Sequence, residues 1–177
     1  SSGHSFLLSV RRHIMRNYIY LHALEKGLPL PIGTQDSSLF DAQANDGDTD
    51  KDGNKQQNTE ITAQSLEDFE KAAAGGYSLL KTKHGSEFEW LRSDLFKDTL
   101  AAELTQDAAR LFTILKLAGD WRPEKDEKLA ELQKLLTKKH PNEKVLLFSQ
   151  FADTIDYLND QLQARGLKKF AAVTGDT

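Results

Sequence analysis

The stretch 144-KVLLFSQFADTIDYLNDQLQARGLKKFAAVTGDT-177 changes its hydrophobic period twice along its length. It opens with a continuous apolar run at 145–148, which is typical of a strand covered on both faces. A helical pattern follows over 152–165, and Gly166 is its predicted stop. A second apolar run occupies 170–173. The order strand, helix, strand predicts two parallel strands joined by a helical crossover.

Two strands are too few to bury a parallel sheet. We therefore expect further strands from a longer parent chain or from another molecule, and the unpaired sheet edge predicts self-association. Both predicted strands end in polar residues, Ser149-Gln150 and 174–177, on the rim where α/β sheets gather ligands. The helix that starts at Ala152 would favour an anion there. Ordinary turn residues are the competing interpretation.

The rest of the chain is predicted to be mostly helical. Apolar residues recur at three- and four-residue spacing over 6–26, 93–118 and 124–139. Each of these segments is followed closely by a glycine or a proline, which supplies a stop. The fold class predicted from the sequence is therefore mostly α with a small α/β part.

A shorter helix is predicted at 65–74. Ser65 can cap its N-terminus, and Asp68, three positions on, supplies the acidic partner of a capping box. The pair Gly75-Gly76 then breaks the pattern and predicts a hinge.

The segment from about 41 to 64 is rich in Asp, Asn, Gly and Gln and has almost no apolar residue. It cannot offset its ordering entropy by burial, so we predict a flexible acidic loop. Within it, 48–53 matches the start of an EF-hand calcium loop. The twelfth position, normally a bidentate glutamate, is Thr59, so the acidic loop is favoured over a calcium site.

The net charge of -4 gives the chain no global attraction to nucleic acid. Any contact with DNA therefore needs a local basic face. The predicted helix at 6–26 offers one candidate in Arg11, Arg12 and Arg16, with an ordinary solvated surface as the competing interpretation.

The chain has no cysteine, which excludes disulfides, thiolate zinc sites and a cysteine nucleophile. Its histidines are scattered and predict no metal site. Its apolar runs are far shorter than the roughly 20 residues that cross a bilayer. We expect a cytoplasmic protein without a membrane contact.

The run KVLLFSQFADTIDYLNDQLQARG followed by KFAAVTGDT resembles the start of the C-terminal RecA-like lobe of Swi/Snf-like superfamily 2 helicases and translocases. The preceding DEKLAELQKLL is similar to the helix before that lobe. Upstream, RRHIMRNYIYLHALEKGLPLPIGTQD is similar to the region between the motor lobes in bacterial members. The resemblance implies a helical inter-lobe region at 1–122 and the start of the C-terminal helicase lobe at 123–177, with an incomplete RecA-like parallel unit.

The resemblance also implies a parent protein that hydrolyses ATP between two RecA-like lobes and moves along DNA. Ser149 and Gln150 match the fourth motif of the family, and the next motif matches Thr174, Gly175, Asp176 and Thr177. Both motifs are expected to face the nucleic-acid strand.

The sequence lacks a phosphate loop ending in Gly-Lys-Thr or Gly-Lys-Ser, an Asp-Glu-x-His box and the later motif with its arginines. We therefore expect ATP and Mg²⁺ to be bound by the parent, and we expect no catalytic residue, cofactor or ATP hydrolysis in this chain alone. DNA and the remaining motor lobes are the expected partners.

The competing hypothesis is a stand-alone helical interaction module that docks a partner on the face of the 93–118 helix, without motor activity. A calcium-sensing module is a third alternative.

Overall fold

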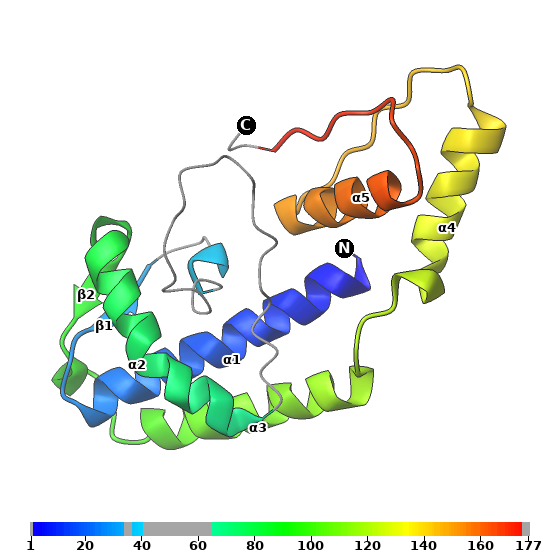
Figure 1. Ribbon diagram of the computed structural model, residues 1–177. Helices are drawn as coiled ribbons and strands as arrows, with labels where there is room; N and C mark the ends of the chain where they lie inside the picture. The colour runs from blue at the N-terminus through cyan, green and yellow to red at the C-terminus, as the bar shows by residue number, and fades with distance from the viewer. Residues whose placement is uncertain (1, 34–36, 41–64, 175–177) are drawn as a thin grey trace. The chain divides into compact units, whose positions relative to one another are not determined.

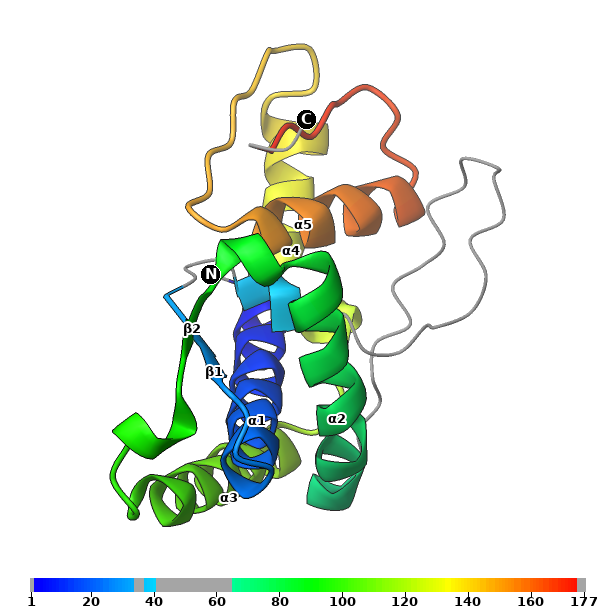
Figure 2. The same cartoon turned by 90° about the vertical axis from the view of Figure 1, so that its left-hand side faces the viewer.

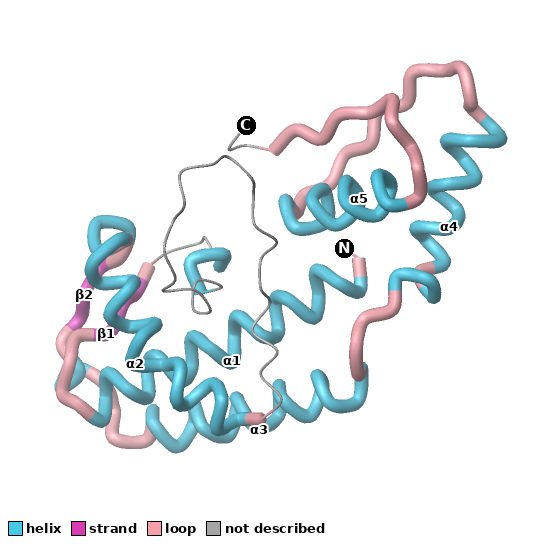
Figure 3. The backbone as a smooth tube through the Cα atoms, viewed as in Figure 1, coloured by secondary structure: helices cyan, strands magenta, loops and turns pink. Residues whose placement is uncertain are grey.

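A computed structural model describes residues 2–33, 37–40 and 65–174 (Figure 1). The chain divides into two compact units. We call Ser9–Leu117 the helical unit, and Ala118–Thr177 together with Ser1–Leu8 the C-terminal unit. Helices dominate the described residues, and a small antiparallel pair of strands accompanies them, which confirms the predicted mostly α class (Figure 3). The boundary predicted between residues 122 and 123 separates an inter-lobe region from the start of a helicase lobe. This assignment stays a prediction.

Three helices and two strands make up the described part of the helical unit, and the first helix begins in residues 1–8. The elements are α1 (Gly3–Glu25), β1 (Leu30–Ile32), α2 (Leu66–Lys83), β2 (Glu89–Leu91) and α3 (Leu100–Ala118). Single 3-10 turns are η1 (Ser37–Phe40), η2 (Gly85–Glu87) and η3 (Ser93–Leu95).

Helix α1 confirms the helix predicted at 6–26. It begins earlier because the Ser2 hydroxyl accepts a hydrogen bond from the Ser5 amide at 3.1 Å and satisfies a free donor of the first turn. It ends before Gly27, whose φ of +62° is a conformation that glycine adopts without strain. Its buried face, which includes Ile14 and Ile19, belongs to the core of the helical unit.

Helix α2 confirms the capping box but corrects the predicted hinge. The Ser65 hydroxyl accepts from the Asp68 amide at 3.3 Å, and the Asp68 carboxylate accepts from the Ser65 amide at 2.9 Å. The helix then runs through Gly75 and Gly76 to Lys83. Glycine lowers helix stability by only about 1 kcal/mol per residue. The buried side chains on both sides of the pair outweigh this loss; they are Phe69, Ala73, Tyr77 and Leu80.

Helix α3 begins at Leu100, so the predicted start at residue 93 was wrong. Residues 93–95 form the turn η3 instead, and the Arg92 guanidinium binds the Asp94 carboxylate beside it. Ala108 and Phe112 are the buried residues of α3.

The small sheet was not predicted. Strands β1 and β2 pair antiparallel, with Leu30 opposite Leu91. Two tyrosine hydroxyls fix β1 in place: Tyr20 donates to the Pro31 carbonyl at 2.7 Å and Tyr77 to the Pro29 carbonyl at 2.9 Å. Figure 2 shows the two strands edge to edge beside α1.

The described part of the C-terminal unit contains the 3-10 turn η4 (Pro123–Lys125), α4 (Glu127–Lys134), the π-helical turn η5 (Leu135–Lys139) and α5 (Ala152–Ala164). The helices predicted at 124–139 and 152–165 are therefore confirmed, the first with a change of helical type. Its core consists of Leu129, Tyr157 and Leu162, with Trp121, Leu132, Leu136, Leu158, Leu167 and Phe170 packed around them.

The predicted parallel β-α-β unit is not found. Residues 145–148 precede α5 in the chain and 170–173 follow it, and both are loop rather than strand (Figure 3). Leu146 is 73% exposed and Phe148 is 86% exposed. Along the described residues of this unit no strand runs beside either segment, so neither has the backbone partners that a strand requires.

Within the described ranges, every helix falls short of the length or the apolar character that spanning a bilayer requires.

Candidate functional site

The turn before α5 holds two of the predicted site residues. Ser149 and Gln150 are exposed and are the two residues before Phe151, the N-cap of the helix. The Ser149 hydroxyl accepts a hydrogen bond from the Phe151 amide at 3.2 Å and donates one to the Phe151 carbonyl at 3.2 Å. The hydroxyl therefore organises the turn locally and leaves the Gln150 side chain to solvent.

The second predicted motif is described only at its start. Thr174 is half-buried at the end of the extended segment after α5. Gly175, Asp176 and Thr177 lie outside the described residues, as does the EF-hand-like stretch at 48–59.

A polar network beneath α5 fixes the helix on α4. The Tyr157 hydroxyl donates to one carboxylate oxygen of Asp126 at 2.9 Å, and the other oxygen accepts from the Leu129 amide at 3.1 Å. Asp126 thus caps the N-terminus of α4 and binds α5 with the same side chain. The Trp121 indole donates to the Tyr157 oxygen at 3.1 Å and completes this hydrogen-bond network.

The pKa of Tyr157 is raised from 10.0 to about 12, chiefly by burial; the Asp126 carboxylate adds to the rise, whereas the Trp121 and Arg165 contacts oppose it. The phenol therefore stays neutral at physiological pH and remains a donor to the buried carboxylate. Sequence reasoning missed this network, although an aspartate just before a helical pattern is an N-cap signal.

A second contact joins the end of α5 to α4. The Arg165 guanidinium donates to the Gln133 side chain at 2.9 Å and to the Pro123 carbonyl at 3.0 Å. Helix α5 is therefore held at its middle and at its C-terminus, and the turn with Ser149 and Gln150 projects from its other end.

The first turn of α1 packs inside the same unit. The His4 ring stacks on Tyr157 with a centroid distance of 4.9 Å, and the Ser5 hydroxyl lies 2.9 Å from that of Thr154. A Cβ atom added at Gly3 would lie 2.3 Å from the Trp121 ring, so only glycine fits this approach. These contacts support the first turn of α5, next to the candidate turn.

The predicted basic face on α1 is partly absorbed into the helical unit. Arg12 is only 7% exposed, and Arg11 and Arg16 are half-buried. The Arg16 guanidinium contacts the His13 imidazole. Burial and the Arg16 charge lower the pKa of His13, whereas Asp107 on α3 opposes this shift.

Asp107 also connects this region to the interior. The buried Asn17 donates to its carboxylate at 2.8 Å. The polar side chains around His13 therefore help to pack α1 against α3, and the basic surface left for phosphate is smaller than the sequence suggests.

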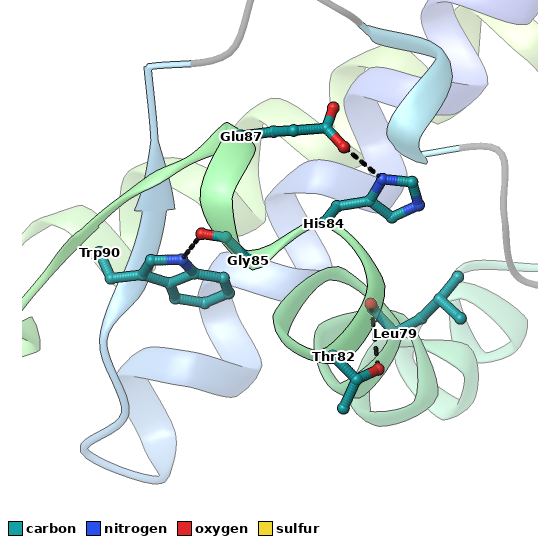
Figure 4. A network of polar contacts seen from close by, with 6 residues as sticks. All are labelled: Leu79, Thr82, His84, Gly85, Glu87 and Trp90. Carbon is teal, nitrogen blue, oxygen red and sulfur yellow. Dashed lines mark hydrogen bonds and ion pairs between the residues drawn. The ribbon is translucent and has the colours of Figure 1, made fainter.

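A further polar network lies where α2 ends (Figure 4). The His84 ring nitrogen Nδ1 lies 2.7 Å from the Glu87 carboxylate, and the Trp90 indole donates to the Gly85 carbonyl at 2.8 Å. Trp90 also meets Tyr77 edge-on, with a centroid distance of 5.6 Å. This tryptophan ties the turn after α2 to β2, and its packing leaves it poorly suited to stacking on a base.

An open hollow of about 450 Å³ lies in the helical unit. Its lining mixes apolar, acidic and basic side chains; they are Leu24, Ser93, Asp94, Phe96, Lys97, Asp98 and Ala101. Among the described residues, no three histidines and carboxylates gather in a way that could hold a metal ion.

No protein-family model matches the sequence, and neither a curated protein nor a solved structure matches it.

Proposed function

We propose that this chain is part of an ATP-dependent DNA helicase or translocase of the Swi/Snf-like superfamily 2 type. It would supply the helical region between the motor lobes and the first DNA-facing motifs of the second lobe. One observation carries the proposal: a helix, an apolar run ending in Ser149-Gln150 and a second apolar run ending in Thr174 follow one another in the order that the family resemblance requires. Helices α4 and α5 are consistent with that order.

We propose further that 145–148 and 170–173 become parallel strands of a RecA-like sheet when more strands of the parent lie beside them. Their exposure supports this. Leu146, Phe148 and Val173 are 73%, 86% and 74% exposed, and burying each large apolar side chain contributes about 1.5–3 kcal/mol. Without those strands the same segments would favour self-association of this chain.

In the proposed complex, the turn at Ser149 and Gln150 contacts the DNA strand. The free amides and the dipole at the start of α5 favour a phosphate oxygen nearby. The packing of Tyr157 on Asp126 supports this role, because it holds α5 and hence the turn in place. The motif at 174–177 would contribute a second contact on the same rim.

ATP and Mg²⁺ would be bound by other segments of the parent, since this sequence lacks the motifs that bind them. DNA and the remaining motor lobes are the proposed partners, and the proposed location is the cytoplasm.

The test is ATP hydrolysis by the full-length parent, measured with and without duplex DNA beside this chain alone. We expect DNA-stimulated turnover by the parent and none by this chain. A parent that carries Ser149→Ala and Gln150→Ala should keep its DNA-independent turnover and lose stimulation by DNA. Absence of turnover in the parent under both conditions would refute the proposal.

The second candidate is a helical interaction module without motor activity. Exposed apolar side chains on α3 favour it, because Ile114 is 40% and Leu117 is 83% exposed. It predicts that the chain is a stable monomer. Substitution of apolar residues at 145–148 by uncharged polar ones should then leave its stability and oligomeric state unchanged, whereas Leu117→Ser abolishes partner binding.

A further inference from the structure

Helix α3 turns one face away from the core of the helical unit. Its buried residues Ala108 and Phe112 belong to the core that α3 shares with α1 and α2. In Figures 1 and 2 the helix runs along the edge of this unit, with α1 and α2 on one side of it. Ile114 and Leu117 point away from that core and are 40% and 83% exposed. Part of the α3 surface is therefore apolar and is not covered by the described residues.

The same face carries one acid and one base. Glu103 and Arg110 are exposed and lie seven residues apart, which is two helical turns, so their side chains leave the helix in nearly the same direction. Two turns separate them by about 10.5 Å along the axis, too far for an ion pair within one helix. In the part of the chain that the structure describes, neither side chain forms an ion pair. Both charges are thus available to a partner.

The other two charged side chains of α3 are engaged on their own chain. The Asp107 carboxylate accepts a hydrogen bond from the buried Asn17 at 2.8 Å. The Lys116 ammonium lies over the Phe112 ring, 4.9 Å from its centroid. Glu103 and Arg110 therefore determine the charge that this face presents.

The rest of the face is uncharged and mostly small. Its exposed members are Ala102, Gln106, Ala109 and Thr113. The Thr113 hydroxyl donates to the Ala109 carbonyl at 3.0 Å, so covering this residue would leave no donor unsatisfied. A second helix can therefore approach the face closely without a desolvation cost at this hydroxyl.

We propose that α3 pairs antiparallel with α3 of a second copy of this chain, through the face that carries Glu103 and Arg110. A two-fold axis midway between these residues, level with Gln106 and Asp107, places Glu103 of each copy opposite Arg110 of the other. A parallel pairing would set Glu103 against Glu103 and Arg110 against Arg110. Charges that flank a helix pair determine its orientation, so the antiparallel arrangement is favoured.

Charge complementarity identifies a second copy as the partner. A two-fold interface requires a patch that is complementary to itself, and an acid and a base at equal distances from the axis meet this requirement. The contact is only one helix wide. It is therefore smaller than the standard protein interface of about 1,600 Å², and we expect a weak, reversible dimer.

This dimer is independent of the motor function proposed above. It uses the helical unit alone, whereas self-association through the apolar run at 145–148 would use the C-terminal unit. A test that reports position along α3 separates the two contacts.

The test is disulfide formation between single cysteines on α3, because the chain has no cysteine of its own. Gln106→Cys lies beside the proposed axis, where helices about 8–10 Å apart bring two cysteines within disulfide range. Thr113→Cys is the matched control on the same face, since its two copies would lie about 20 Å apart along the helices. Under mild oxidation, gel electrophoresis without reductant should show dimer formation by Gln106→Cys at least about tenfold faster than by Thr113→Cys.

Charge reversal in the Gln106→Cys chain tests the register. Glu103→Arg alone and Arg110→Glu alone each place like charges opposite one another in the pair, so each should slow the disulfide. An equal mixture of the two variants should restore its rate, because each chain then faces opposite charges. Restoration in the mixture also shows that both variants fold.

Equal rates for Gln106→Cys and Thr113→Cys would overturn the proposal. Single reversals that leave the rate unchanged would also overturn it, as would a mixture that stays as slow as the separate variants.

Discussion

The helical unit buries its large apolar side chains, whereas the C-terminal unit leaves a run of them exposed to solvent. In the helical unit Ile14, Ile19 and Leu80 are fully buried, and Phe69 is 2% exposed. In the C-terminal unit the apolar run at 145–148 is exposed from end to end. Both units have confirmed helices. The difference shows that a local pattern suffices to form a helix, whereas an apolar strand needs neighbours to cover it.

Removal of a buried ring should have the largest effect, and it should affect the helical unit. Phe69 meets Phe112 edge-on with a centroid distance of 6.5 Å. Phe69→Ala should lower the free energy of unfolding by about 3–5 kcal/mol through lost burial and a cavity. Urea unfolding followed by Trp90 fluorescence in a Trp121→Phe background measures it.

The matched control is Phe148→Ala, at a position that is 86% exposed. We expect a change below about 0.5 kcal/mol. Equal losses for the two variants would break the contrast between the units.

Loss of the buried carboxylate should weaken the C-terminal unit next most strongly. Asp126→Ala removes the N-cap of α4 and leaves the Tyr157 hydroxyl without its acceptor, for a combined loss of about 2 kcal/mol. Trp121 fluorescence in a Trp90→Phe background reports it. Asp126→Asn keeps a capping oxygen and should lose less, and an unchanged transition in Asp126→Ala would contradict the assigned network.

Alkaline pH should destabilise the C-terminal unit through Tyr157. Its folded-state pKa is raised from 10.0 to about 12, so its contribution to stability is complete below pH 10 and is lost as pH rises through the folded value. Trp121 fluorescence should therefore show a lower urea midpoint at pH 11.5 than at pH 9. Tyr157→Phe should remove most of that difference, and an equally steep decline in this variant would assign the pH effect to other groups.

A small gain in stability should follow from Gly75→Ala in α2. Gly75 is helical, and a Cβ atom there would meet nothing within 4 Å. Alanine should therefore stabilise the helical unit by about 0.4–1 kcal/mol, mainly by restricting the unfolded chain. Thermal unfolding measures the shift. A loss of stability would instead support the hinge that the sequence predicted at Gly75-Gly76.

The smallest effect on folding, but a clear one on association, is expected from Phe148→Ser. Stability should change by less than about 0.5 kcal/mol, because the side chain is already exposed. Self-association measured by sedimentation velocity should decrease, since the exposed run is the proposed contact. Unchanged association would place the contact elsewhere, for example on the exposed part of α3.

The sequence was sufficient for the helices because their signals are local. The capping box at Ser65 and Asp68, the periodicity of α1 and the stop at Gly27 lie within a few residues of the elements that they define. The stop predicted at Gly75 failed because burial of Phe69 and Tyr77 acts across the glycines, which a local rule does not register.

Long-range contacts could not be predicted in the same way. The pairing of β1 with β2 joins residues about 60 positions apart, and the bond between Tyr157 and Asp126 joins two helices. The apolar runs at 145–148 and 170–173 carry a strand pattern, but the pattern does not supply the neighbouring strands. For the candidate site, the sequence located the turn at Ser149 and Gln150 but not the polar network that holds α5 beneath it.

We propose that the C-terminal unit is an incomplete motor lobe in which 145–148 and 170–173 lack the neighbouring strands that would pair with them. Amide hydrogen exchange at 145–148 and 170–173, measured in this chain and in the full-length parent, tests it most directly. The account predicts fast exchange in this chain and strong protection in the parent, where the strands would pair. Fast exchange at both segments in the parent would contradict it.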